Sequence, residues 1–496
     1  MRRLAWIEEI HCQHRILPTA SFLVRRQHMG EISPALSRNK EWVKSRFEKC
    51  DDILNRQVFL EDGKKEGLLV YVEVAVSNLM LEEHVIGLSD VQPLNTYEEA
   101  ESALLAGNGI LFLADDSQAY KISSKGYPGL GVSKAESEKV MRGSKEGFTE
   151  SEKLNVALIR KRLRDPRMKV EEQQIGVRSH TMTALVYMED LVYPDLLDTM
   201  KERMKAYEID GILDSGMLEQ LTEKHWLSPF PQFQATERPD RAASAVLEGR
   251  VVLVTDHSPT VLVFPSDYNS FFQTSDDWYN RFEIATFARL LRFFAAILAM
   301  SFPAIYVAVT TWHTSLLPTN LILSMAEARQ GVPFPSLGEV LLMEISFELI
   351  REAGIRLPGP IGNTIGIVGG LIIGQSAVAA NVVSPIVVIV VAFTALCSFA
   401  IPNEEFASAF RLLKYGCIFM GAWLGLYGVL LSYLWVLIHL SHLNSFGIPY
   451  LMPYVASDLN DYEDKRDSLI RYPFRMMKKR PVFAKRDARV KLRKKG

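Results

Sequence analysis

The amino-acid sequence predicts a soluble α/β half, followed by an all-helical membrane half and a basic tail. Three observations carry this prediction. Charges are dense up to about residue 287, whereas apolar runs dominate from Phe293 to Leu440. Short β-type runs separated by helical stretches in the first half are typical of α/β folds. Residues 471–496 carry twelve Lys or Arg and one acid, so the chain's net charge of −2 hides a tail of +11.

A strand-and-helix pattern occurs twice in the first half. Each copy begins with a strand that contains the string Val-Tyr, and later has a strand that ends in a turn with Asp. The distance from that Tyr to that Asp is 44 residues in the first copy and 69 in the second. We therefore predict two related α/β modules at about 51–125 and 175–266. The expected strands are at 69–73, 109–114, 119–122, 185–189, 250–255 and 260–264, and the expected helices run through residues 82–84 and from about 194 to 207.

The stretch between the two modules also has a recognisable helix. A helix is expected from about Thr149 to Leu163, with Thr149 and Glu152 as a capping box. Asp165 and Pro166 end it, because the residue before proline is disfavoured in α geometry. The predicted organisation is a lead-in at 1–50, a first module at 51–147, a linker helix and second module at 148–285, a transmembrane domain at 286–456 and a tail at 457–496.

The membrane half has five apolar segments, and the last is long enough to span a bilayer at roughly 20 residues per crossing. The start of the chain has no apolar core typical of a signal peptide, so we expect the first half to stay cytoplasmic. The basic tail is expected on the same side. The number of crossings is then even, four being favoured and six allowed. The segments are Phe293–Trp312, Leu337–Ile350, Ile361–Val383, Pro385–Ile401 and Cys417–Leu440, with short re-entrant or interfacial pieces at Leu316–Met325 and Phe446–Val455.

No enzyme site is recognisable in the sequence. Phosphate-binding glycine loops, zinc-protease helices and nucleophile elbows are all missing. The four cysteines do not pair as CxxC, and the histidines do not gather at ligand spacings. We therefore expect neither an enzyme nor a cofactor or metal site. The basic tail is expected to contact membrane lipids; nucleic acid is the weaker alternative.

Acidic residues in the second apolar segment are the strongest functional signal. Glu344 and Glu348 lie on one helix face, and Glu339 lies on a neighbouring face. Acids inside a membrane usually face a bundle interior or a water-filled path, and a ring of Glu favours cations. These three residues are therefore the candidate pore lining. The open alternative is an amphipathic interfacial helix whose acids pair with Arg351 or Arg356.

Two other features are candidates for packing and contact roles. Gly366, Gly370 and Gly374 are four residues apart, which favours close helix packing. Aromatic residues between 268 and 279 are interpreted as a belt at the membrane surface. A proline-rich stretch supplies candidate partner or subunit contacts, with a plain surface loop as the alternative; these candidates are Pro229, Phe230, Pro231 and Arg238.

Several strings resemble a known family. They are SPFPQ (228–232), TERPDR (236–241), LEGRV (247–251), the long string from Ala326 to Gly362, SFAIPN (398–403) and SFGIPYLMP (445–453). In this order they resemble the GerA family of spore germination proteins, which includes germinant receptor A subunits and SpoVAF-type relatives. The resemblance runs from about residue 150 to residue 455, and the long central string is the most specific part.

The resemblance implies a multi-pass protein of the spore inner membrane with two α/β subdomains in its N-terminal region. It implies a ring-shaped homo-oligomer that forms a cation channel and releases ions from the spore core in response to nutrient germinants. The implied partners are a transporter-like B-type membrane subunit and a C-type lipoprotein. The alternatives are a SpoVAF-type amplifier channel downstream of the receptors, a secondary transporter, and a non-conducting membrane scaffold.

Overall fold

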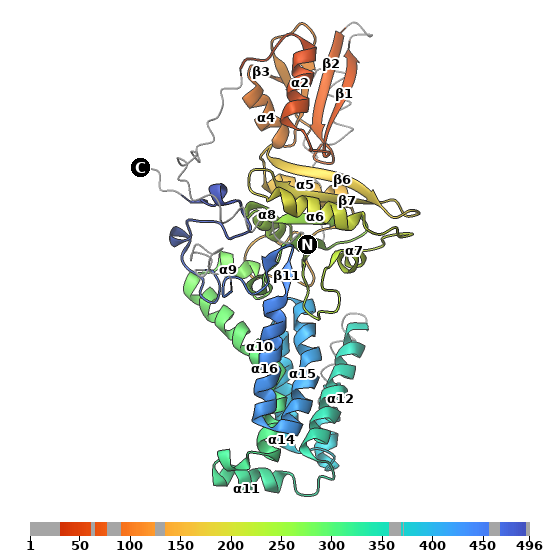
Figure 1. Ribbon diagram of the computed structural model, residues 1–496. Helices are drawn as coiled ribbons and strands as arrows, with labels where there is room; N and C mark the ends of the chain where they lie inside the picture. Colours follow the sequence, from red (N-terminus) through yellow and green to blue (C-terminus); the bar gives the residue numbers. More distant parts are fainter. Residues whose placement is uncertain are drawn as a thin grey trace, which may run out of the picture.

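The computed structural model describes residues 30–60, 65–76, 91–124, 134–356, 369–370, 372–455 and 467–492. Two α/β modules and a helical half follow one another along the long axis of the molecule (Figure 1). The second module lies between the first module and the helices, so any signal that passes between the first module and the helices has to cross two junctions.

The first module is a five-stranded antiparallel sheet in the order β1-β2-β4-β5-β3. Helices α2 and α4 pack on one face of this sheet, against apolar side chains of β2 and β4. The other face carries a smaller apolar cluster. The elements are α2 (Leu36–Arg46), β1 (Ile53–Leu60), β2 (Lys65–Val72), β3 (Val91–Leu94), α4 (Tyr97–Leu105), β4 (Gly109–Leu113) and β5 (Ala119–Ile122).

The second module repeats this topology with the order β6-β7-β9-β10-β8, again antiparallel throughout. Its sheet is covered on both faces, because Val186 packs under α5 and α8 while Leu185 packs under α6 and α7. The prediction of two related α/β modules is thus confirmed. The elements are α5 (Glu152–Arg162), β6 (Met168–Ile175), β7 (Thr181–Met188), α6 (Pro194–Met204), α7 (Ser215–Thr222), β8 (Gln234–Thr236), α8 (Pro239–Leu247), β9 (Val251–Thr255) and β10 (Val261–Phe264).

The structure of this half differs from the prediction in two local respects. The first strand of each module, β1 and β6, was not predicted, because both edge strands carry polar side chains in the middle. The capping box at Thr149 is also wrong: the cap residue of α5 is Ser151 without a side-chain cap, and Thr149 bonds to Asn155 instead. The helix expected near residues 82–84 lies outside the described residues.

Backbone and buried charge join the two modules. The Asp51 amide donates to the Val170 carbonyl at 3.0 Å, and the Val170 amide donates to the Lys49 carbonyl at 2.9 Å. Beside them the guanidinium of Arg160, which is 0% exposed, holds the carboxylate of Asp52 through two hydrogen bonds of 2.7 and 2.8 Å. The first module is therefore fixed to the second by a short and largely buried joint.

A short 3₁₀ turn, η1 (Tyr268–Phe271), and α9 (Ser275–Tyr279) lead from the second module into the helical half. Among the described helices, α10 is the one that is both long and apolar enough to cross a membrane by itself; α14 and α16 are apolar but shorter. The helices are α10 (Phe282–Thr311), α11 (Thr319–Ala328), α12 (Ser336–Arg356), α14 (Pro385–Phe399), α15 (Glu404–Leu424) and α16 (Leu426–His442), with a 3₁₀ turn η2 (Thr314–Leu316) before α11.

Contacts between helix ends fix the directions of these helices. Thr310 at the end of α10 bonds to Ser336 at the start of α12. At the opposite end of the bundle, Arg351 of α12 meets Glu404 at the start of α15. Helices α10 and α15 therefore run away from the modules, and α12, α14 and α16 run toward them. Helix α11 lies across the far end of the bundle (Figure 1).

The fifth apolar segment, Cys417–Leu440, was predicted as one spanning helix, and this is wrong. The chain reverses at Gly425, whose φ of +63° favours glycine, so the segment is the hairpin of α15 and α16. The hairpin packs tightly: a Cβ on Gly428 would lie 1.9 Å from the Met420 carbonyl oxygen. Two antiparallel helices of 21 and 17 residues, both reaching beyond the segment, replace the single one.

The stretch at 446–455 and the aromatic residues before α10 also differ from the predictions. A small hairpin of β11 (Asn444–Ser445) and β12 (Ile448–Pro449) packs on the second module, with Phe446 against Phe233 and Phe264. Phe271 and Phe272 are 0% exposed and pack on Phe406 of α15. They belong to the interior of the junction rather than to a surface belt.

The described part of the basic tail, residues 467–492, packs on the second module and on α10. Asp467 bonds to Arg289 of α10 at 2.9 Å, and the Lys485 amide donates to the Leu191 carbonyl at 2.9 Å. The backbone of Ala484 lies so close to Gly249 that a Cβ there would be 2.7 Å from it. The tail also contains two short 3₁₀ turns, η4 (Phe474–Met476) and η5 (Arg486–Ala488).

Candidate functional site

Glu339, the first candidate pore residue, is fully enclosed at the start of α12. Its side chain is 0% exposed. One carboxylate oxygen accepts from the guanidinium of Arg329 at 2.9 Å, and the other accepts from the Ser384 amide at 2.9 Å, where α14 begins. Both oxygens are thus bound within the chain, and Glu339 joins the starts of α12 and α14.

Glu344 lies one and a half turns further along α12 and is 1% exposed. Lys414 of α15, which is 5% exposed, donates to one of its oxygens. The other oxygen, Oε1, has no hydrogen-bond partner within the described residues. This buried ion pair therefore leaves one carboxylate oxygen of Glu344 available to accept a hydrogen bond from water or to contact a cation.

Glu348, one turn beyond Glu344, belongs to a larger charge network. It pairs with Arg351, whose guanidinium also bonds to Glu404 at 3.1 Å, and Arg411 bonds to Glu404 at 2.8 Å. Buried nitrogens of Arg351 and Arg411 have no hydrogen-bond partner in the described part of the chain. The line of Glu344, Glu348, Arg351, Glu404, Arg411 and Lys414 between α12 and α15 is called the charged seam below.

Sequence reasoning found two acids of the charged seam, Glu344 and Glu348, but missed the third, Glu404, and two of its three bases. Lys414 and Arg411 precede the apolar run of α15. Nothing local in the sequence assigns Lys414 to Glu344, an acid 70 residues earlier, and Arg411 pairs with Glu404 two turns earlier on α15 itself. The pairing of Glu348 with Arg351 does match the interfacial-helix alternative, as does the pair of Glu352 with Arg356 on the exposed end of α12. A pore lining by these acids stays a proposal.

The candidate glycines are only partly described. Gly366 lies outside the described residues. A Cβ on Gly370 would meet nothing within 4 Å, and one on Gly374 would lie 3.6 Å from Val388. Close helix contact occurs instead at Gly421, where a Cβ would lie 2.8 Å from the Ala304 carbonyl oxygen. Within one chain the predicted glycine face is largely open.

The proline-rich loop joins the second module to the helices. Phe230 is 1% exposed, and its ring lies 5.7 Å from the rings of both Phe406 and Phe410 of α15. The Pro231 carbonyl accepts from the Tyr450 hydroxyl at 2.9 Å. Pro229, which directly precedes Phe230, is half-buried. These candidate contact residues are thus engaged inside the chain, at the junction of module and helices.

Arg238 organises the neighbouring part of the second module. Its guanidinium, 2% exposed, donates to the Ser144 carbonyl at 2.8 Å, to the Glu138 carbonyl at 3.2 Å and to Asp240 at 2.8 Å. A further bond reaches Ser275 of α9 at 3.2 Å. The residue therefore holds the inter-module stretch and the start of the helical half on one module.

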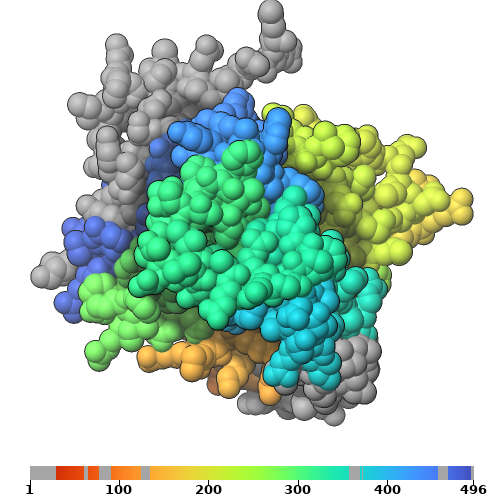
Figure 2. Space-filling view, turned by 90° about the horizontal axis from the view of Figure 1, so that it is seen from below, coloured from red at the N-terminus to blue at the C-terminus, as the bar shows by residue number. Residues whose placement is uncertain are grey.

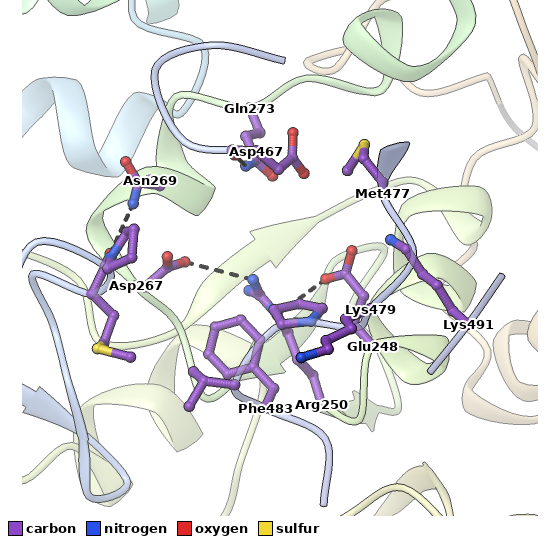
Figure 3. Close-up of a pocket in the computed structure, with 14 residues that line it drawn as sticks. Glu248, Arg250, Asp267, Asn269, Gln273, Asp467, Met477, Lys479, Phe483 and Lys491 are labelled. Atoms are coloured by element: carbon purple, nitrogen blue, oxygen red, sulfur yellow. Dashed lines mark hydrogen bonds and ion pairs between the residues drawn. The ribbon is translucent and has the colours of Figure 1, made fainter. Parts of the chain in front are cut away.

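A small charged cavity of about 60 Å³ lies where the second module meets the tail (Figure 3). Arg250 lies between Glu248 and Asp267, at 3.5 Å from each, and its guanidinium stacks 3.9 Å from the ring of Phe483 in the tail. Burial raises the pKa of Glu248, of Asp267 and of Asp467. Acidic and basic side chains meet in this cavity, and the contact of Arg250 with Phe483 holds the tail on the second module.

Within the described ranges, no three His, Cys, Asp or Glu side chains converge on a point that could hold a metal ion. The charged seam and the charged cavity both consist of paired acids and bases. Such groups can bind ions, water or other side chains, and neither contains the nucleophile and base pairing that covalent catalysis needs.

Comparisons with known proteins identify the family. The family model described as "Bacillus/Clostridium GerA spore germination protein" matches residues 41–483. The chain is 37% identical to "Uncharacterized membrane protein YfkQ" of Bacillus subtilis (strain 168), over 91% of each chain. It is 34% identical to spore germination protein KA of the same organism, over 93% of this chain and 88% of that one. Spore germination protein GerLA of Bacillus cereus is 38% identical over 83% of each chain.

A solved structure also matches, the N-terminal domain of the A subunit of the Bacillus megaterium spore germinant receptor GerK3. It is 24% identical, with a TM-score of 0.39, and the match covers 48% of this chain and 98% of that one. The family model and the relatives extend over most of the chain, through the modules, the helices and part of the tail. The chain therefore belongs to the GerA family of spore germination proteins.

Proposed function

We propose that this chain is a membrane subunit of a spore germination complex and forms an oligomeric cation channel that releases ions from the spore core in response to nutrient germinants. The observation that carries the proposal is the charged seam. Buried charge within apolar helices is costly, and it is usually found along ion pathways or water-filled cavities. Glu344, with one oxygen unbound, is the group that this channel would present to a cation.

A single chain would offer a cation only one partly open group, Oε1 of Glu344, so the proposed pore draws one such group from each of several copies. Lys414 neutralises Glu344, so a single copy offers no line of free acids. The outer surface of the helices is apolar over much of its length, with exposed side chains on every long helix; examples are Phe294, Leu349, Leu412 and Leu434. Lipid and further copies of the chain would cover this surface. Gly370 and Ile373 are three residues apart and both exposed, so they lie on one face that a second copy could cover.

The remaining parts of the proposal follow from the family. The protein would be multi-pass in the spore inner membrane, with both modules and the tail on the core side. It would act with a B-type membrane subunit and a C-type lipoprotein and would have no enzymatic role. The proposed domain boundaries are those given above, except that α2 (Leu36–Arg46), which packs on the first sheet, belongs with the first module and not with the lead-in.

A non-conducting scaffold is the second candidate, and one observation favours it. Both oxygens of Glu339 are bound inside the chain, and Glu348 is paired as well. Acids that are satisfied in this way can serve helix packing alone. A channel and a scaffold therefore differ in what they predict for Glu344.

The test is the conductance of the purified full chain in planar bilayers. Wild type is compared with Glu344→Gln and with the matched control Glu352→Gln, an acid near the exposed end of the same helix. The channel predicts cation-selective currents that change in Glu344→Gln and stay the same in the control. The double variant Glu344→Gln with Lys414→Met checks that an unpaired lysine is not the cause of the change. No current from correctly assembled wild-type oligomers would favour the scaffold.

A further inference from the structure

Two large apolar side chains are exposed on a turn of the second module. Trp226 is 73% exposed and Leu227 is 78% exposed. They are the central residues of the turn from His225 to Ser228, which is closed by a hydrogen bond of 2.9 Å from the Ser228 amide to the His225 carbonyl. The His225 amide is also tied to the Gln232 side chain at 3.4 Å. Because these hydrogen bonds fix both ends of the turn, the side chains of Trp226 and Leu227 stay on the surface of the module.

This turn lies at the end of the helical bundle. The Ser228 hydroxyl bonds to His439 in the last turn of α16 at 2.9 Å. One turn earlier, Trp435 stacks on His439 with the ring centroids 5.9 Å apart, and it is 58% exposed on the outer face of the helix. An extended chain reaches about 3.5 Å per residue, so the Cα of Trp226 lies within about 7 Å of the Cα of Ser228, which contacts α16.

The turn therefore continues the apolar outer face of α16. In Figure 1 the segment after α7 descends to the module end of α15 and α16. Figure 2, seen from the far end of the helices, shows a part of the second module that projects beyond the bundle. The underside of this projecting part is turned toward the far end of the helices, so it would face the surface of a bilayer around them.

We propose that the turn from His225 to Ser228 is a membrane anchor, in which Trp226 and Leu227 enter the headgroup region of the lipid bilayer beside α16. The inference rests on the proposed membrane placement of the helices. Tryptophan is enriched at this depth because its ring is apolar and its N–H is polar. The exposed Lys224 before the turn adds a cation that suits lipid phosphates.

A lipid anchor at this place would act directly on the junction. Phe230, two residues after Ser228, packs on α15. Lipid contact would thus hold the module at a fixed height over the helices.

The test uses the full chain with its four native cysteines replaced by alanine and reconstituted in vesicles of phosphatidylglycerol and phosphatidylethanolamine. Single cysteines at positions 226 and 227 carry a bimane label. Phe59→Cys, an exposed position on the first module, is the aqueous control, and Trp435→Cys is the membrane control. Quenching by shallow doxyl lipids reports lipid contact, and quenching by iodide reports water.

The anchor predicts that labels at 226 and 227 are quenched by doxyl lipid and lose iodide quenching, while the label at 59 shows the reverse. Iodide quenching at 226 equal to that at 59, with lipid quenching at 435, would overturn the anchor and leave the membrane placement intact. Shielding from both quenchers, with cross-linking between copies at 226, would also overturn it in favour of a protein contact. No lipid quenching at 435 would overturn the membrane placement and the anchor together.

Discussion

Replacing Glu152 by Gln should remove a large pH dependence from the joint between the two modules. Glu152 is 1% exposed, and neither of its carboxylate oxygens has a hydrogen-bond partner among the described residues. Its surroundings are acidic, with Glu172 of β6, Asp256 after β9 and Glu73 from the first module. The nearest base, Lys153, is engaged with Glu73 at 2.7 Å. The carboxyl group therefore has no countercharge of its own.

Burial, followed by the charges of Glu172 and Asp256, raises the pKa of Glu152 from 4.5 to about 8. Between pH 4.5 and about pH 8, Glu152 is protonated while the joint is closed and loses its proton when the joint opens to water. The joint is thus most stable at low pH, loses stability as the pH rises toward 8, and changes little above it. At about 1.4 kcal/mol for each pKa unit, the full loss has an upper limit of about 5 kcal/mol, and about 2 kcal/mol of it falls between pH 6 and pH 8.

Hydrogen exchange of the full chain in detergent measures this effect. The amides of Asp51 and Val170 cross the joint, and their opening constants can be compared at pH 6 and pH 8 after correction for intrinsic exchange. Wild type should open more at pH 8, by up to about tenfold per pH unit. Glu152→Gln should lose this difference, whereas Glu150→Gln, an exposed acid two residues earlier, should keep it. An unchanged pH dependence in Glu152→Gln would refute the reasoning.

Two further predictions concern close backbone contacts. Gly428→Ala places a Cβ 1.9 Å from the Met420 carbonyl oxygen, so the α15–α16 hairpin should lose about 1–3 kcal/mol or more of stability, seen as a lower Tm. Gly416→Ala on α15, where a Cβ would meet nothing within 4 Å, should not lower the Tm. Equal Tm values for the two variants would contradict the packing argument. Gly249→Ala combines a φ of +88° with a Cβ 2.7 Å from Ala484, so the tail should detach from the module and be cut faster by trypsin. Gly338→Ala, whose Cβ would make ordinary contacts near 3.5 Å, serves as the control. If Gly249→Ala is cut at the wild-type rate, the tail is held elsewhere.

The central strands of both modules could be predicted because they are continuous apolar runs, buried on two faces. The edge strands β1 and β6 could not, because their middle residues are polar or charged and are partly or fully exposed in a row. The reversal at Gly425 was missed for a different reason. Hydropathy across Cys417–Leu440 has no break, and a turn between two apolar helices needs only one residue with positive φ.

The acids on α12 could be found from the sequence, since charge inside an apolar segment stands out. Their partners could not, because Lys414 meets Glu344 through the packing of two helices about 70 residues apart. The same limit applies to Phe271 and Phe272. Aromatic residues before a membrane helix are expected at a surface, and only the three-dimensional arrangement shows that Phe406 covers them.

The shared strand order of the two modules has an evolutionary consequence. An ancestral unit that was duplicated in tandem gives two copies with equal topology and unequal constraints. The second copy holds 25 more residues between its corresponding Tyr and Asp, and this interval contains the proline-rich loop that touches α15 and α16. That copy is bound to its present partner elements, whereas the first copy touches the rest of the chain mainly at the inter-module joint. A substitution in the outer copy therefore disturbs fewer contacts with the rest of the chain, so the outer copy is the less constrained of the two.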